Sequence, residues 1–313
     1  MARPRKFRFG VQTTSTRSAK DWREHARKVE ALGYSTLFMP DHFIDTQLAP
    51  MVAISFAAAV TEQLRIGMLV LGNDYKHPAI TAKEAATIDV LSDGRLEFGL
   101  GAGWQKTDYD ALDLRYDSPG TRIERLGEAI SIIKSAWAPG AFEFTGKHYR
   151  IRNYDSVPKP VQRPRPPILI GGGGRRLLRL AGREADIVGI NPNLRAGAVT
   201  ADAVQTSLAA QTLAKVGWVR EGAGERFGEI ELQIRYFLAA ITDNAKGFAS
   251  AVAPRFGISP DDALGSGIAL VGTVDSVCEL LQQRREQWGV SYVVPGEDNF
   301  EAFAPVVARL AGT

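Results

Sequence analysis

The sequence predicts a (β/α)8 barrel, and three observations lead to that fold class. Short apolar runs alternate with helical segments eight times along the chain, as a repeated strand-then-helix unit requires. The apolar runs are nearly continuous rather than alternating, which is typical of parallel strands covered on both faces. The length of 313 residues suits one such barrel. A doubly wound parallel sheet is the competing fold, because sequence alone does not show that the strands close into a ring.

Four strand-then-helix units fill the N-terminal half. Their predicted strands cover residues 7–13, 35–40, 64–72 and 95–101, and their predicted helices cover residues 18–33, 49–62, 78–91 and 120–137. Ser18 can cap the start of the first helix and Gly33 can end it. Pro78 opens the third helix, at a position where the missing proline N–H is not needed.

Four further units fill the C-terminal half. Their predicted strands cover residues 167–172, 186–191, 229–241 and 290–295, and their predicted helices cover residues 174–184, 200–217, 273–289 and 299–311. We therefore expect one barrel domain over residues 1–313, with two long insertions. Residues 138–166 contain a possible hairpin and a proline-rich spacer. Residues 242–272 follow the seventh strand, where an insertion can act as a lid over the C-terminal face or as a passive surface loop.

Composition excludes several classes of protein. A net charge of +3 is too small to predict nucleic-acid binding without a clustered patch. The densest basic stretch is interpreted as a solvated N-terminal arm; it comprises Arg3, Arg5, Lys6 and Arg8. No apolar run is long enough to span a membrane or resembles a signal peptide, so we expect a cytoplasmic protein without a membrane partner. Cys278 is the only cysteine, which excludes an intramolecular disulfide and a metal site built on thiolates.

The residues just after the strands are the candidates for chemistry, because barrel enzymes build their sites there. Asp41 and His42 follow the second strand. A histidine there can exchange protons near neutral pH, or it can merely orient a loop. Trp104 follows the fourth strand and can line a pocket or pack in the core. Because no metal-ligand motif or nucleophile turn is present, the chemistry is expected to come from a bound cofactor.

Four consecutive glycines, Gly171–Gly174, connect the fifth strand to a helix. Free backbone N–H groups and the helix dipole favour a phosphate at such a junction, and Arg175 and Arg176 add positive charge. The run matches neither the Walker pattern nor the G-x-G-x-x-G pattern. A tight strand-to-helix turn followed by two solvated arginines is the alternative.

Five stretches occur in an order that resembles the bacterial luciferase-like monooxygenase family, most closely its branch using the 5-deazaflavin coenzyme F420. They are "FMPDHF" (38–43), "RIGMLVLG" (65–72), "DVLSDGRLEFGLGAGW" (89–104), "RIERLGEAISIIKSAW" (122–137) and "ILIGGGGRRLLRLAGREADIV" (168–188). The resemblance extends from the first strand to the final helix. It implies a barrel that holds a flavin-type ring at its C-terminal mouth, and a homodimer. The sequence does not separately identify the interface, to which apolar helix faces such as 49–62 can contribute.

The resemblance also implies roles for individual residues. Asp41 and His42 would face the ring and the reacting centre. The family's third strand carries a non-proline cis peptide behind the ring, whose counterpart is the Leu69–Val70 bond. The implied cofactor contacts are Ala102, Gly103, Trp104 and Thr107 for the ring and ribityl chain, Gly172, Gly173 and Gly174 for the phosphate, and Arg175 and Arg176 for the anionic tail. Family members acting on glucose 6-phosphate have a catalytic glutamate where this chain has Trp104, which favours an apolar or aromatic substrate.

The leading hypothesis is an F420-dependent oxidoreductase that transfers a hydride between the deazaflavin and a small organic substrate. His42 would donate or accept the proton, and residues 242–272 would roof the pocket. An FMN-dependent monooxygenase using reduced flavin and O2 is the alternative within the same family. A non-catalytic flavin-binding barrel is an alternative from another class. A hydrolase is less favoured, because no spacing among the acidic residues identifies a working carboxylate pair.

Overall fold

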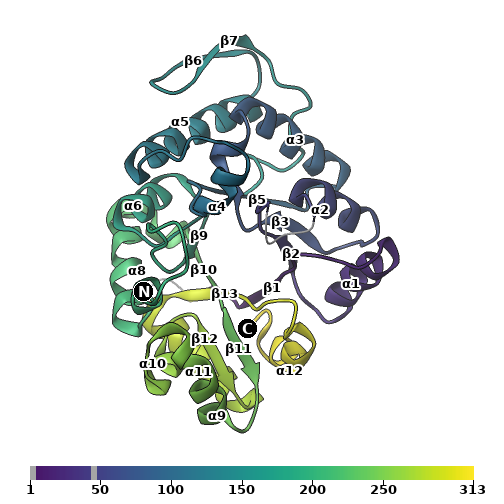
Figure 1. The fold of residues 1–313 in the computed structure, drawn as a ribbon. Helices are drawn as coiled ribbons and strands as arrows, with labels where there is room; N and C mark the ends of the chain where they lie inside the picture. The colour runs from purple at the N-terminus through teal and green to yellow at the C-terminus, as the bar shows by residue number, and fades with distance from the viewer. Residues whose placement is uncertain (1–4, 44–47) are drawn as a thin grey trace.

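Eight parallel strands close into a barrel in the computed structural model, which describes residues 5–43 and 48–313 (Figure 1). The barrel strands are β1 (Arg8–Gln12), β2 (Thr36–Met39), β3 (Arg65–Met68), β5 (Leu96–Gly101), β8 (Ile168–Gly172), β9 (Ile187–Ile190), β10 (Glu231–Arg235) and β13 (Val290–Val294). Hydrogen bonds between β3 and β5 close the ring. The predicted barrel is confirmed, and the doubly wound sheet is excluded.

Helices cover the outside of the strands (Figure 1). They are α1 (Ala19–Ala31), α2 (Pro50–Ala59), α3 (Pro78–Leu91), α5 (Pro119–Trp137), α6 (Arg175–Glu184), α8 (Ala209–Ala223), α11 (Val274–Trp288) and α12 (Phe300–Leu310). The predicted end signals are present: the Ser18 side chain accepts from the Asp21 N–H, and Gly33 has a positive φ of 81°. None of the helices in the described part of the chain is long and apolar enough to cross a membrane.

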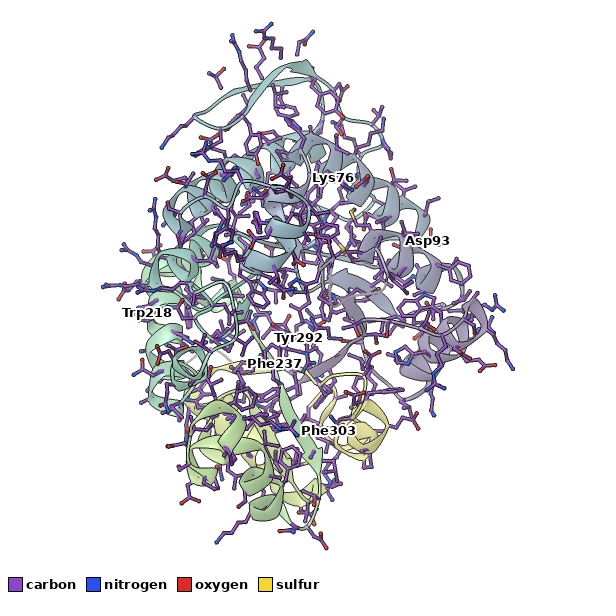
Figure 2. The ribbon with its side chains drawn as sticks, in the orientation of Figure 1. Lys76, Asp93, Trp218, Phe237, Tyr292 and Phe303 are labelled. Atoms are coloured by element: carbon purple, nitrogen blue, oxygen red, sulfur yellow. The ribbon has the colours of Figure 1, made fainter. Side chains whose placement is uncertain are left out.

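A buried charged layer fills the N-terminal end of the barrel. Glu97 of β5 accepts from Arg65 Nε at 2.8 Å and from the Tyr292 hydroxyl at 3.0 Å, and it also pairs with Arg8. Burial raises the pKa of Glu97, but the two guanidinium groups outweigh it and lower the pKa overall. Figure 2 labels Tyr292 near the centre of the strands. The other end of the barrel is therefore the one left for a ligand.

Arg8 corrects the interpretation of the basic N-terminal stretch. It is the first residue of β1 and also pairs with Glu231 at 2.6 Å, so it belongs to the barrel rather than to a solvated arm. The sequence pattern did not predict these ion pairs, because Glu97 and Glu231 are distant from Arg8 in the chain. Arg3 lies outside the described residues.

The third strand is interrupted where the family resemblance implied. β3 ends at Met68, β4 (Leu71–Gly72) resumes the pairing with β5, and the peptide bond between Leu69 and Val70 is cis. Small residues on β5 make room for this bulge. A Cβ on Gly99 would collide with the Met68 carbonyl oxygen, and one on Gly101 would lie 2.7 Å from Val70 Cγ2.

The predicted seventh strand, 229–241, is two strands in the structure. β10 ends at Arg235, and β11 (Leu238–Ile241) leaves the barrel to pair with β12 (Ala269–Gly272). A continuous apolar run does not reveal such a change of partner. Between β11 and β12 lie α9 (Ala245–Val252), η3 (Ala253–Phe256) and α10 (Pro260–Gly265). In Figure 1 this layer lies beside α11 at the edge of the ring of helices rather than across the strands, so it does not form the expected roof.

Two shorter segments also differ from prediction. The helix expected at 200–217 is divided into α7 (Ala201–Gln205) and α8, because the buried Lys215 ammonium binds the Thr206 carbonyl at 2.6 Å and holds the turn between them. An additional helix, α4 (Lys106–Ala111), follows β5. It was expected to be part of a loop, since six residues are too few to show helical periodicity.

The possible hairpin within 138–166 is confirmed. β6 (Phe142–Thr145) and β7 (Arg150–Tyr154) pair antiparallel and project beyond α3 and α5 (Figure 1). The Glu128 carboxylate of α5 accepts backbone N–H groups from residues 147–149 and fixes the tip of the hairpin. This arm therefore keeps a defined position outside the barrel.

Candidate active site

His42 and Asp108 form a hydrogen-bonded pair at the C-terminal end of the barrel. His42 comes shortly after β2, and its Nδ1 lies 2.7 Å from Asp108 Oδ2. Asp108, on α4, is completely buried and also accepts from the Phe43 N–H at 3.1 Å and the Tyr75 hydroxyl at 3.4 Å. These contacts fix the imidazole, whose Nε2 forms no hydrogen bond within the described part of the chain. The geometry suits a histidine that exchanges a proton at Nε2.

Asp108 is the candidate site residue that the sequence analysis did not identify as the partner of His42. It is separated from His42 by 66 positions, so only the fold brings the two side chains together. The available signal was its place in the segment after the fourth strand, where site residues were expected. Asp108 acts on the imidazole, and we describe it as a positioning residue.

Asp41 does not contact the imidazole of His42. Its Oδ2 accepts the Gly72 N–H at 3.0 Å, which ties the end of β2 to β4. Burial raises the pKa of Asp41, while the Gly72 N–H and the charge of His42 oppose that rise. The structure therefore gives Asp41 a supporting contact at the strand ends, where it also lines a cavity.

The loop after β5 brings Trp104 against His42. The two rings meet edge to face with centroids 5.3 Å apart. Gly103 has a positive φ of 73°, and a Cβ there would collide with the Tyr109 hydroxyl, so this turn requires glycine. Ala102 is buried beside the turn, whereas Thr107 lies on an exposed position of α4. Three of the four predicted ring contacts thus lie on the turn that seats Trp104 against His42.

The glycine run has two distinct explanations in the structure. A Cβ on Gly172 would lie 2.6 Å from the Leu177 side chain, and one on Gly173 would collide with the Pro192 carbonyl oxygen. Gly174 differs, because its nearest neighbour, Asn193 Oδ1, would be 3.9 Å from a Cβ. Gly174 is also the N-cap of α6, and no side chain caps that helix. An uncapped helix start with open space above it fits a phosphate.

Arg175 and Arg176 begin α6 but face solvent. Arg175 pairs with Glu221 at 3.0 Å, and Arg176 pairs with Glu124 at 2.8 Å. The structure therefore brings these residues to the predicted anion site while giving each guanidinium a carboxylate partner. No cluster of three or more potential metal-ligating side chains occurs among residues 5–43 and 48–313.

A family model described as luciferase-like monooxygenase matches residues 6–246. The chain belongs to the luciferase-like monooxygenase family. Among solved structures, this luciferase-like chain is similar to the coenzyme F420-dependent tetrahydromethanopterin reductase from Methanopyrus kandleri. The TM-score is 0.76 at 20% identity, with 97% of this chain and 98% of the other covered. At 20% sequence identity, this similarity is evidence for a shared fold alone.

Curated relatives of this luciferase-like protein use two different cofactors. The FMNH2-dependent dimethylsulfone monooxygenase of Pseudomonas putida is 36% identical over 143 residues, covering 45% of this chain and 39% of the relative. The F420-dependent glucose-6-phosphate dehydrogenase of Microbacterium testaceum (strain StLB037) is 30% identical over 188 residues, covering 58% of this chain and 55% of the relative. The chain thus matches about half or less of the length of these relatives, all of which are oxidoreductases by name.

Proposed function

We propose that this protein is an F420-dependent oxidoreductase that transfers a hydride between the deazaflavin and a small organic substrate in the cytoplasm. The observation that carries the proposal is the His42–Asp108 pair, which lies beside Trp104 at the strand ends. When bound, the deazaflavin would supply a carbon that accepts or gives the hydride. Hydride transfer at a carbon bound to oxygen also changes the protonation of that oxygen, and Nε2 of His42 is placed to give or take this proton.

The remaining site residues would hold the cofactor. The bulge at Leu69 and Val70 would support the ring, and the free N–H groups that begin α6 at Gly174 would bind its phosphate. Arg175 and Arg176 would meet an anionic tail after releasing their glutamate partners. Release costs little, because water screens exposed ion pairs and they contribute little to stability. Trp104, whose indole lies against His42 where glucose 6-phosphate enzymes of the family have a glutamate, favours an apolar or aromatic substrate.

An FMN-dependent monooxygenase is the second candidate. The specific observation in its favour is the 36% identity to the FMNH2-dependent monooxygenase of Pseudomonas putida. FMN and F420 both combine a flat ring with a phosphate, so the same site residues would serve either cofactor. The fixed imidazole of His42 weighs against a barrel that binds flavin without catalysis.

The cofactor assignment is tested by parallel titration of the purified protein with F420 and FMN, followed by fluorescence. We expect F420 to bind at least about tenfold more tightly, a difference of roughly 1.4 kcal/mol. Tighter binding of FMN, with oxygen consumption during turnover with reduced FMN, would replace the proposal with the monooxygenase. Absence of binding by both would contradict the whole cofactor site.

We further propose that two copies associate through α2 and α3. Helix α2 contains no charged residue, yet Val52 is 73% exposed, and Ile80 of α3 is 52% exposed. A mainly apolar cavity of about 1210 Å³ lies between α2, α3 and the β6–β7 arm. An uncharged helix with small residues suits a two-fold interface, in which the same face meets itself.

Val52→Glu is expected to convert the dimer into a monomer, because the interface would bury two unpaired carboxylates. Sedimentation velocity measures the mass of each variant at equal protein concentration. Leu213→Glu is the matched control, since Leu213 is a similarly exposed apolar residue on α8, away from this face. A wild-type monomer, or a dimer that persists in Val52→Glu, would contradict the proposed interface.

A further inference from the structure

Arg235 is a half-buried cation at the C-terminal end of β10, the end of the barrel where His42 lies. Its Nε donates to Gln12 Oε1 at 2.7 Å, and one of its terminal nitrogens donates to the Tyr236 carbonyl oxygen. The second terminal nitrogen, Nη2, forms no hydrogen bond with any described residue. The guanidinium therefore keeps donors available to a ligand.

Gln12 connects this guanidinium to the expected ring site. Its Nε2 donates to the Leu69 carbonyl oxygen at 2.9 Å, while its Oε1 faces Arg235. Two hydrogen bonds thus lead from Arg235 to Leu69, one of the predicted cofactor contacts. Since both ends of the Gln12 amide are engaged, the guanidinium is held in one orientation beside the mouth of the barrel.

No carboxylate among the described residues forms an ion pair with Arg235. Burial lowers its pKa to about 10, and only the more distant charges of Glu297 and Asp298 oppose that change. Glu297 is already engaged, because its Oε1 accepts both the N–H and the hydroxyl of Thr14. By contrast, the guanidinium groups of Arg8 and Arg65 at the opposite end of the barrel share Glu97. Arg235 thus bears a desolvation cost that a bound anion would offset.

The surroundings of Arg235 leave access for such an anion. Gly296 faces the guanidinium, and a Cβ there would lie 2.7 Å from Nη2. Phe237 is 53% exposed, and its ring centroid lies 4.9 Å from the guanidinium carbon. Figure 2 places Phe237 inside the ring formed by the outer helices. An exposed aromatic ring beside an unpaired guanidinium suits a ligand that is partly apolar and partly anionic.

We propose that Arg235 binds a carboxylate of the substrate, with Phe237 covering the adjoining apolar part. This inference rests on the proposed function, and it narrows the substrate class from small organic molecules to aromatic or aliphatic carboxylates. The phosphate of the cofactor has a separate place at α6, so the two anions would occupy different strand ends. Arg235 would bind and orient the substrate, while His42 would donate or accept the proton.

The test measures binding of benzoate and of the neutral analogue benzamide to the purified chain by calorimetry, with acetate as a minimal carboxylate. We expect benzoate to bind more tightly than benzamide, and Arg235→Met to weaken benzoate binding roughly 10- to 100-fold. Arg235→Lys should recover part of that loss, because it keeps the charge without the planar fork. Arg183→Met is the matched control, since Arg183 is exposed near the end of α6.

F420 and FMN are titrated into the same variants, which separates this inference from the proposed function. Unchanged cofactor affinity in Arg235→Met supports a contact with the substrate. A parallel loss of cofactor affinity would overturn the inference, as would equal binding of benzoate and benzamide or no saturable carboxylate binding by the wild type. If neither cofactor binds, the proposed function fails, and the comparison of benzoate with benzamide still decides the role of Arg235. Melting temperatures establish that each variant is folded.

Discussion

His42→Ala is expected to lower turnover by about 100-fold or more, while the dissociation constant of the cofactor changes by less than about threefold. Asp108 fixes the imidazole, and its Nε2, which forms no hydrogen bond among residues 5–43 and 48–313, is the atom proposed to exchange the proton. Alanine removes that atom without touching the proposed phosphate site at α6. The loss therefore belongs to the chemical step rather than to cofactor binding.

The measurement is single-turnover oxidation of reduced F420 by the best substrate from a panel of ketones and aromatic enones, each with and without a carboxylate. Cofactor affinity is determined separately by fluorescence. Asp108→Asn is the graded companion, because it keeps the shape of the side chain and removes its charge; we expect about a tenfold lower kcat with little change in KM. An unchanged rate in His42→Ala would remove the imidazole from the mechanism. An equal loss of cofactor affinity would make His42 a binding residue instead.

The barrel was predictable because its local signals agree with one another. Apolar strands, the Ser18 cap, Gly33 and Pro78 all indicate the elements that the structure contains. The errors occur where tertiary contacts override the local pattern. The run 229–241 is continuously apolar, yet β11 changes its partner to β12. Arg8 looked like part of a basic arm, but its acidic partners lie on other strands.

The site was predictable only in part. Position after a strand identified His42 and Trp104, since every barrel strand delivers its C-terminal residues to one face. The partner of His42 was not predictable, because Asp108 lies on α4, 66 positions further along the chain, and only the fold brings the two side chains together. Arg235 was missed for a related reason. No acidic side chain among the described residues pairs with Arg235, and this depends on the fold rather than on a sequence motif.

Gly173→Ala and Gly174→Ala are expected to have opposite effects, although the residues are adjacent. At 173 a methyl group would collide with the Pro192 carbonyl oxygen, and backbone atoms would have to shift. We expect the free energy of unfolding to fall by about 1–3 kcal/mol, as for other overpacked sites. At 174 the backbone is extended, with φ −103° and ψ 148°, and the nearest atom would be 3.9 Å away. The free energy of unfolding of Gly174→Ala should therefore change by less than about 1 kcal/mol.

The affinity for the cofactor is expected to fall in Gly174→Ala, the variant whose stability changes less. The methyl group of Gly174→Ala would enter the open space above the N-terminus of α6, where the phosphate is proposed to bind, so we expect at least about tenfold weaker binding of F420 and FMN. Urea unfolding and fluorescence titration measure the two quantities on the same samples. Weaker binding in a fully stable Gly174→Ala would show that this glycine is kept for a ligand, because the protein itself leaves room for a side chain. Unchanged cofactor binding would indicate that the four glycines form only a strand-to-helix turn. Gly173 would then be needed for its close contact with Pro192, and Gly174 would have no requirement for glycine.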